Sequence, residues 1–192
     1  MQAGRACYMR YGLARTTVED IAREASIHRT TVYKYFKNRN EVLAGVALAE
    51  SRSMIAASDE IMRGSGRFAD RLVRAFLAGQ KEIKRSPFLT LLYGPENAAL
   101  TVGATSASEL LQERTRKAMT DYVAEAQASG ELRDDVAAER IADWLNRVNK
   151  MLVADPPAQG QTGSAAILRT FVTRSLEPAG SKPRIDHEQQ EL

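Results

Sequence analysis

The sequence predicts an all-α protein of about nine helices, with an N-terminal three-helix domain and a larger C-terminal helical domain. Apolar residues recur at helical spacing, period-two alternation is scarce, and residues typical of helix caps separate the segments. Hydrophobic residues make up 44% of the 192 residues, enough for a sizeable core. We expect the first domain over residues 1–46, the second over 47–176, and a disordered tail rich in Pro and charge over 177–192.

Three short helices are expected in the first domain. One covers residues 3–11. The next begins with a capping box in which Thr16 and Glu19 satisfy free backbone amides. Its apolar residues fall on one face and are Val18, Ile21, Ala22 and Ala25. After a break, the third helix carries Val32 and Phe36 inward at a spacing of four residues.

Longer helices are expected in the second domain. One runs from Asn38 to about Met62, and another begins at Phe68 and ends at the break before Pro87. Two short pieces divided by Gly94 follow. Three more amphipathic helices are expected over residues 106–130, 136–154 and 164–176.

Positive charge is concentrated near the N-terminus. The net charge is +3, and residues 1–50 hold eight Lys and Arg against five acids, while the remainder holds nineteen of each sign. Residues 25–40 contain four basic residues and no acid. This distribution suits binding to phosphates, although charge alone leaves a solvated basic face as the alternative.

Several classes of protein are disfavoured by composition. No apolar run approaches the roughly 18 residues that span a bilayer, and the first residues lack the apolar core of a secretory signal. The single cysteine, Cys7, excludes an internal disulfide. Its helical, apolar setting favours a packed thiol over a reactive one. We therefore expect a cytoplasmic protein.

Catalytic motifs are also missing from the sequence. The only histidines are His28 and His187, which makes a Ser-His-Asp site or a histidine metal cluster improbable. Residues 160–163 lack the lysine of a phosphate-binding loop. We expect that the protein is not an enzyme and that it binds neither a metal nor a cofactor.

Residues 16–41 carry the functional signal. If two short helices bury their apolar residues against each other, the second helix keeps a polar outward face, made of Arg29, Thr30, Thr31, Tyr33, Lys34 and Tyr35. Arg and Lys can donate to guanine O6 and N7, Thr suits base edges or phosphates, and Tyr hydroxyls bind phosphates. This face predicts a helix that lies in the major groove of DNA. The alternative is that the two tyrosines pack under a neighbouring helix.

The same stretch resembles the DNA-binding domain of the TetR family of bacterial repressors. Seventeen positions match at fixed spacing, and they are Gly12, Thr16, Thr17, Val18, Ile21, Ala22, Ala25, Thr31, Val32, Tyr33, Lys34, Tyr35, Phe36, Asn38, Glu41, Val42 and Leu43. The resemblance covers roughly residues 1–50 and implies a helix-turn-helix. Beyond residue 50 it depends only on the number and layout of helices.

The resemblance implies a role in DNA binding for nine residues, which are Thr17, His28, Arg29, Thr30, Thr31, Tyr33, Lys34, Tyr35 and Arg39. Thr17 and Arg39 match phosphate contacts, the two tyrosines match backbone contacts, and the others match recognition-helix positions near bases or phosphates. The family often has Ser at position 28, which is a better N-cap than His. This departure favours base contact over capping for His28.

A second departure is the start of the chain, which corresponds to the inside of the family's first helix. The usual preceding turn and basic arm are missing, so we expect the sequence to be truncated there. The alternative is a member that binds DNA with fewer contacts and a weaker first helix.

The resemblance also implies a homodimer and a small-molecule effector. Dimerisation is expected through the helices around 136–154 and 164–176, with burial of these helices inside one chain as the alternative. Candidate ligand-lining residues are Phe76, Tyr93, Met119 and Tyr122, which ordinary core packing also explains. We expect a repressor that binds a pseudo-palindromic operator on double-stranded DNA and is released by its ligand. A second interpretation is a DNA-binding structural or division-control protein of the same fold without an inducer.

Overall fold

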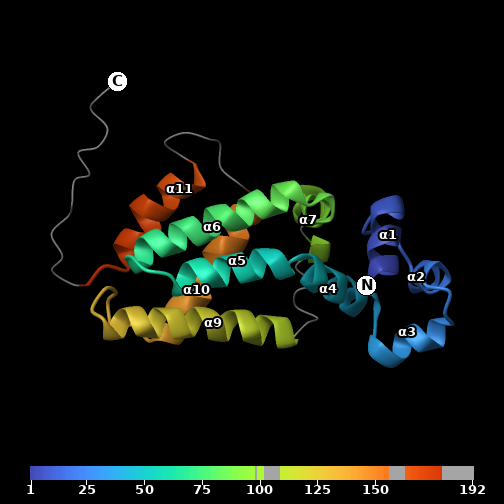
Figure 1. Ribbon diagram of the computed structural model, residues 1–192, viewed down its shortest axis with the longest axis horizontal. Coiled ribbons are helices and arrows are strands. Elements are labelled where there is room, and N and C mark those ends of the chain that lie inside the picture. Colours follow the sequence, from blue (N-terminus) through green and yellow to red (C-terminus); the bar gives the residue numbers. More distant parts are fainter. Residues whose placement is uncertain (98, 102–108, 156–162, 179–192) are drawn as a thin grey trace, which may run out of the picture.

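The computed structural model describes residues 1–97, 99–101, 109–155 and 163–178. These ranges fold into helices without any strand, which confirms the predicted all-α class. The N-terminal helices lie at one end of an elongated molecule, and α5, α6 and α9 run along its length (Figure 1). Within the described ranges, no helix is long and apolar enough to cross a membrane.

Four helices form the N-terminal end, and they are α1 (Gln2–Tyr11), α2 (Val18–Glu24), α3 (Arg29–Tyr35) and α4 (Arg39–Glu50). Gly12 ends α1 with φ 82°, in the left-handed region that favours glycine. The predicted domain limit at residue 46 falls inside α4.

The remaining elements are α5 (Arg52–Arg63), α6 (Phe68–Arg85), α7 (Pro87–Tyr93), η1 (Pro95–Asn97), α9 (Glu109–Ala128), α10 (Ala138–Ala154), α11 (Ser164–Ile167) and the π-helical η2 (Leu168–Thr173). The prediction of one helix from Asn38 to Met62 is wrong, because the chain turns at Ser51 between α4 and α5. The Ser51 side chain is buried, and its interaction with Tyr93 of α7 counteracts part of the rise that burial causes in the pKa of Tyr93. This contact depends on the tertiary fold and has no local sequence signal.

Helix α7 completes the core of the N-terminal end. Buried residues of α1 to α4 pack in one cluster with three side chains of α7, Phe88, Leu89 and Leu92. Each of these three is at most 1% exposed. The helix-turn-helix and α7 therefore share one hydrophobic core, which we call the N-terminal core.

A second cluster, the C-terminal core, joins α5, α6, α9, α10, α11 and η2. Helix α5 packs along α6, and α9 packs along α10. The last helical segment is tied to α6 by an ion pair of 3.1 Å between Arg169 and Asp70. A hydrogen bond from Gln80 to the buried Ser164 adds a second tie.

Candidate nucleic-acid interface

The helix-turn-helix is formed by α2, α3 and the tight turn between them. Ile21, Ala22 and Val32 are at most 5% exposed and belong to the N-terminal core, with Phe36 packed against it. The turn places Ser26 at φ 54°, an uncommon conformation for a residue other than glycine. The amide of Ile27 donates to the Ala22 carbonyl at 3.0 Å, which closes the turn.

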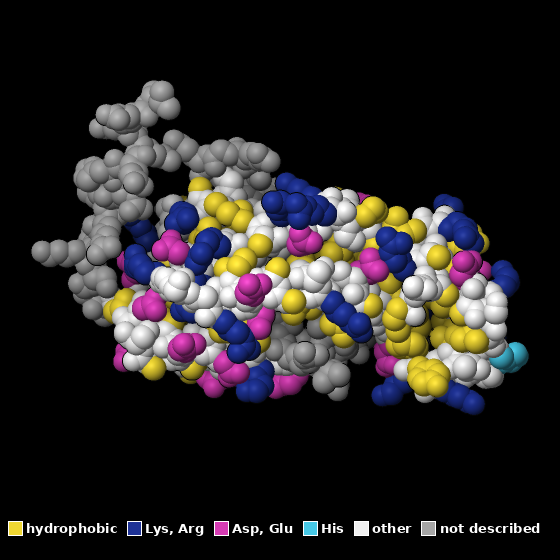
Figure 2. All heavy atoms as spheres, in the orientation of Figure 1, with side chains coloured by type: hydrophobic (Ala, Val, Ile, Leu, Met, Phe, Trp, Pro, Cys, Tyr) yellow, Lys and Arg dark blue, Asp and Glu magenta, His cyan; other side chains and the backbone are white. Residues whose placement is uncertain are grey.

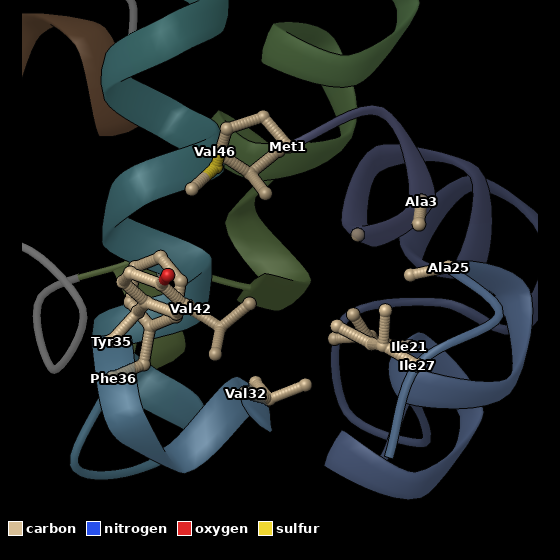
Figure 3. Close-up of a pocket in the computed structure, with 11 residues that line it drawn as sticks. Met1, Ala3, Ile21, Ala25, Ile27, Val32, Tyr35, Phe36, Val42 and Val46 are labelled. Carbon is tan, nitrogen blue, oxygen red and sulfur yellow. The ribbon is translucent and has the colours of Figure 1, made fainter. Parts of the chain in front are cut away.

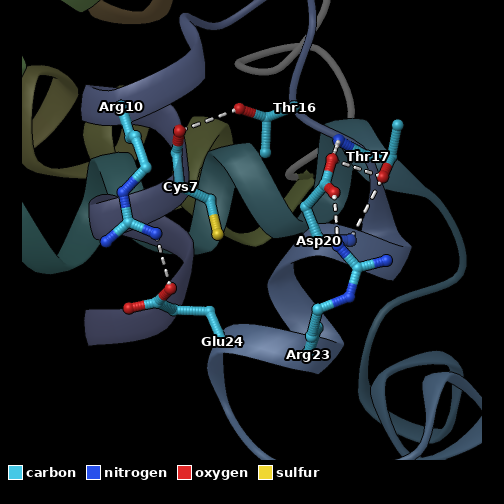
Figure 4. Close-up of polar contacts among 7 residues, drawn as sticks. All are labelled: Cys7, Arg10, Thr16, Thr17, Asp20, Arg23 and Glu24. Carbon is cyan, nitrogen blue, oxygen red and sulfur yellow. Dashed lines mark hydrogen bonds and ion pairs between the residues drawn. The ribbon is translucent and has the colours of Figure 1, made fainter.

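The start of α2 differs from the sequence prediction by one residue. The capping box uses Thr17 and Asp20 (Figure 4), so the prediction of Thr16 and Glu19 is wrong. Thr16 is 1% exposed, and its hydroxyl donates to the carbonyls of Cys7 and Gly12 at 3.1 and 2.8 Å. Its hydroxyl therefore joins α1 to α2 inside the domain and leaves the cap to its neighbour.

Thr17 is exposed, as a phosphate contact requires, but its donors are already engaged. Its hydroxyl and its amide both donate to the Asp20 carboxylate, at 2.6 and 3.0 Å. These hydrogen bonds hold the pKa of Asp20 below its usual value. A phosphate at this position would compete with Asp20 for the same donors.

His28 is the N-cap of α3, which corrects the expectation of base contact in place of capping. Its Nδ1 accepts from the Thr30 amide at 3.4 Å and lies 2.9 Å from the Thr30 hydroxyl oxygen. Nδ1 is as many bonds from the backbone as the side-chain oxygen of Asn, so it can reach the second amide of the helix in the same way. The ring is also exposed.

The outward face of α3 is as open as predicted. Arg29, Thr30, Tyr33, Lys34 and Tyr35 are exposed, and Thr31 is half-buried. Tyr33 and Tyr35 are 46% and 77% exposed, so the alternative that they pack under a neighbouring helix is wrong. Figure 2 shows Lys and Arg side chains around this end of the molecule.

Arg39 has a different setting from the other candidates. Its Nε donates to the Thr16 carbonyl at 2.8 Å, and its Nη2 donates to the Leu13 carbonyl. The guanidinium thus ties the start of α4 to the connection between α1 and α2. The residue type at position 39 does not indicate where its side chain points, so the sequence alone did not predict this internal contact.

Ion pairs of α2 were also missed from the sequence. Glu19 accepts from Arg29 of α3 at 3.0 Å, and Glu24 accepts from Arg10 of α1 at 2.9 Å (Figure 4). The partners are ten and fourteen residues apart, beyond the spacing that one helix brings together. Only the packing of separate helices creates these pairs.

An apolar hollow of about 110 Å³ lies among α1, α2, α3 and α4. Figure 3 shows Val32, Tyr35 and Phe36 on one side and Met1 with Val46 nearer α4. Apart from Tyr35, the lining side chains are apolar. No sequence pattern marks this hollow, because each helix contributes only a few of its residues.

The four ligand-lining candidates do not lie together. Phe76, Met119 and Tyr122 belong to or pack against the C-terminal core, whereas Tyr93 packs against the N-terminal core. The Tyr122 hydroxyl donates to Asp59 of α5. Burial and the Asp59 carboxylate raise the pKa of Tyr122 to about 12.

The N-terminal end of the chain matches a known family. Residues 1–46 match the family model described as bacterial regulatory proteins, tetR family. The HTH-type transcriptional regulator YhgD of Bacillus subtilis (strain 168) is 26% identical over 120 residues, which make up 62% of this chain and 61% of that protein. The chain thus matches less than two thirds of the length of this relative.

Solved structures with a similar fold include SmeT, the repressor of the Stenotrophomonas maltophilia multidrug efflux pump SmeDEF. Its TM-score is 0.60 at 20% identity, over 95% of this chain and 93% of that chain. The transcriptional regulator FadR from Bacillus subtilis, in complex with stearoyl-CoA, has a TM-score of 0.58 at 14% identity, over 80% and 82% of the two chains. At these identities the likeness shows a shared fold.

Proposed function

Because residues 1–46 match the tetR family model, we propose that the chain is a transcriptional regulator of this family that binds a specific operator on double-stranded DNA. The observation that carries this proposal is the exposed polar face of α3 above the buried Val32. The core holds this helix in place, while its Arg, Lys, Thr and Tyr side chains remain available to bases and phosphates. Such binding places the protein in the cytoplasm.

The residues of this face divide into two groups. Arg29 and Lys34 are the cations that can reach base edges, with Thr30 and Thr31 beside them. The other group, Thr17, His28, Tyr33 and Tyr35, offers hydroxyls and an imidazole for the phosphate backbone. Arg39 supports the domain from inside and is not needed as a contact in this proposal.

We further propose that the protein acts as a homodimer through α10 and the segment α11–η2. Trp144 and Met151 of α10 are 39% and 56% exposed, and Phe171 of η2 is 69% exposed. The same helices bury Leu145, Leu152 and other apolar residues inside the chain, so they carry apolar side chains both inside and outside. A two-fold axis there would present two α3 helices to half-sites about 34–36 Å apart.

The proposed regulation is repression that a small molecule relieves. Such a ligand must bind more tightly to the conformation that cannot bind DNA than to the conformation that can. A preference of about 100-fold corresponds to about 2.7 kcal/mol. Phe76, Met119 and Tyr122 supply apolar bulk and one hydroxyl at the C-terminal core. Tyr93 packs at the N-terminal core and is proposed to transmit the change through α7.

Unbiased selection of DNA tests the proposal. The purified protein is incubated with sheared fragments of its source genome at near-physiological salt, and the retained DNA is sequenced. Enrichment of a pseudo-palindrome is the expected result. Retention of all fragments alike would favour an architectural DNA-binding protein, and no retention would contradict DNA binding altogether.

Variants of α3 sharpen this test. Tyr33→Ala should weaken binding to all sequences, while Lys34→Ala should weaken binding and change base preference. Lys81→Ala, which removes an exposed cation from α6, away from the proposed dimer interface, is the matched control. Normal operator binding by the Tyr33 and Lys34 variants would contradict the assignment of α3 as the recognition helix.

A further inference from the structure

Glu19 places a carboxylate on the surface that the proposed function presents to DNA. Its Oε1 lies 3.0 Å from Nη1 of Arg29, and the two side chains are 48% and 60% exposed. A negative charge there is unfavourable by itself, because it faces the phosphates of the duplex. A compensating role is therefore needed to explain this residue at this place.

Helix capping does not supply that role. Asp20 completes the capping box of α2 with Thr17, while Glu19 and Asp20 both lie in the first turn, where the helix dipole favours negative charge. Glu19 is left without a capping task. It instead crosses from α2 to the first residue of α3.

The geometry of the pair leaves Arg29 able to bind a base. A guanidinium has five N–H donors in a planar fork, and the contact with Glu19 uses Nη1. Among the described residues, Nε and Nη2 of Arg29 have no other hydrogen-bond partner. An arginine held from behind by a carboxylate also loses less rotamer freedom when it binds guanine O6 and N7.

We propose that Glu19 is a positioning residue that aims Arg29 at a guanine and keeps it from acting as a non-specific phosphate clamp. This inference rests on the proposed function, and it assigns Glu19 a part in operator discrimination. The carboxylate competes with phosphates for Arg29, whereas the bidentate guanine contact leaves it in place. Glu19 thereby raises the ratio of operator affinity to non-specific affinity.

Two substitutions separate position from charge. Glu19→Gln removes the charge, so non-specific binding should become tighter and the affinity ratio should fall by about threefold to tenfold. Glu19→Asp keeps the charge but is one methylene shorter, so it loses the contact with Arg29. Its affinity ratio should fall as well, because the freed Arg29 can bind phosphates, while the retained charge keeps its gain in non-specific affinity smaller than that of Glu19→Gln.

The experiment measures affinity for the selected operator, for its single-base variants and for a random duplex, all at one salt concentration. Glu24→Gln is the matched control, because Glu24 lies on the same helix and is paired with Arg10 at 2.9 Å. Arg29→Ala completes a double-mutant cycle with Glu19→Gln. In the Arg29→Ala background, Glu19→Gln should leave the affinity ratio unchanged. As single substitutions, Glu19→Gln and Arg29→Ala should relax the base preference at the same base pair.

The outcomes distinguish this inference from the proposed function. Failure of the wild type to discriminate any sequence would overturn the proposed function itself. If Glu19→Gln discriminates between operator and random DNA as well as the wild type does, only the role of Glu19 is overturned. The same holds if Glu19→Gln lowers this discrimination by the same factor in the Arg29→Ala background. Thermal denaturation of Glu19→Gln near the wild-type midpoint confirms that the exposed substitution leaves the fold intact.

Discussion

The ring of Tyr8 in α1 packs against the ring of Phe88 in α7, with centroids 6.3 Å apart and planes inclined by 54°. Both side chains are 0% exposed. This contact lies in the N-terminal core, which α1 to α4 share with α7. Because α7 packs on α1 and α4, a change in its position would reach α2 and α3 through these two helices.

Phe88→Ala tests the strength of this junction. The substitution leaves a cavity in the N-terminal core, and we expect the free energy of unfolding to fall by about 3–5 kcal/mol. Urea denaturation measures the loss. Leu77→Ala, at a side chain that is 41% exposed on α6, should change it by less than about 1 kcal/mol. Equal losses for both variants would contradict a shared core.

Arg39→Ala distinguishes an internal role from a phosphate contact. Loss of its hydrogen bonds to the Thr16 and Leu13 carbonyls should lower the free energy of unfolding by about 1–3 kcal/mol. A lost phosphate contact would instead reduce the slope of log affinity against log salt by about 1. We expect the first effect without the second. Lys37→Ala, at an exposed cation just before α4, is the comparison for stability.

His28 is tested by exchange for another capping residue. His28→Ala removes the acceptor for the Thr30 amide and should cost about 1 kcal/mol of stability. His28→Asn should restore this stability, because Asn is a strong N-cap. Thermal denaturation and operator affinity are measured together. A variant with Asn that is stable but binds operator weakly would show that the imidazole also contacts DNA.

The hydrogen bond from Tyr122 to Asp59 predicts a pH-dependent difference between the wild type and Tyr122→Phe. The pKa of Tyr122 is raised to about 12, so its stabilising effect is complete below its usual pKa of about 10 and is lost as pH rises through 12. The wild type should therefore have the higher denaturation midpoint at neutral pH. This advantage should disappear near pH 12. A difference that does not change with pH would contradict the role of this hydrogen bond.

Phe171→Glu tests the proposed dimer. A buried, unpaired carboxylate in the interface should shift the protein to monomers, because removing a charge from water is costly. Sedimentation equilibrium measures the change in association. Leu77→Glu introduces the same charge at another exposed apolar position, on α6, and should leave the dimer intact. Dissociation by both variants would indicate a general effect of charge.

Local interactions made much of the fold predictable from the sequence. The all-α class and the exposed face of α3 follow from residue periodicity, and the ends of several helices follow from caps and breakers. Gly12 and Pro87 mark the end of α1 and the start of α7 because their backbone preferences act within a few residues. The TetR resemblance likewise depended on residue types at fixed spacing in one short stretch.

Only the tertiary structure decided which partners those residues take. It turned Arg39 inward, buried Thr16, and joined Glu19 to Arg29. It also separated Tyr93 from the other ligand candidates and added α7 to the N-terminal core. The physical reason is that these contacts join helices remote in sequence, and their direction depends on how whole helices pack. The sequence by itself determined the helical class and the ends of several helices. Tertiary packing divided α4 from α5 and determined the chemistry available to each side chain.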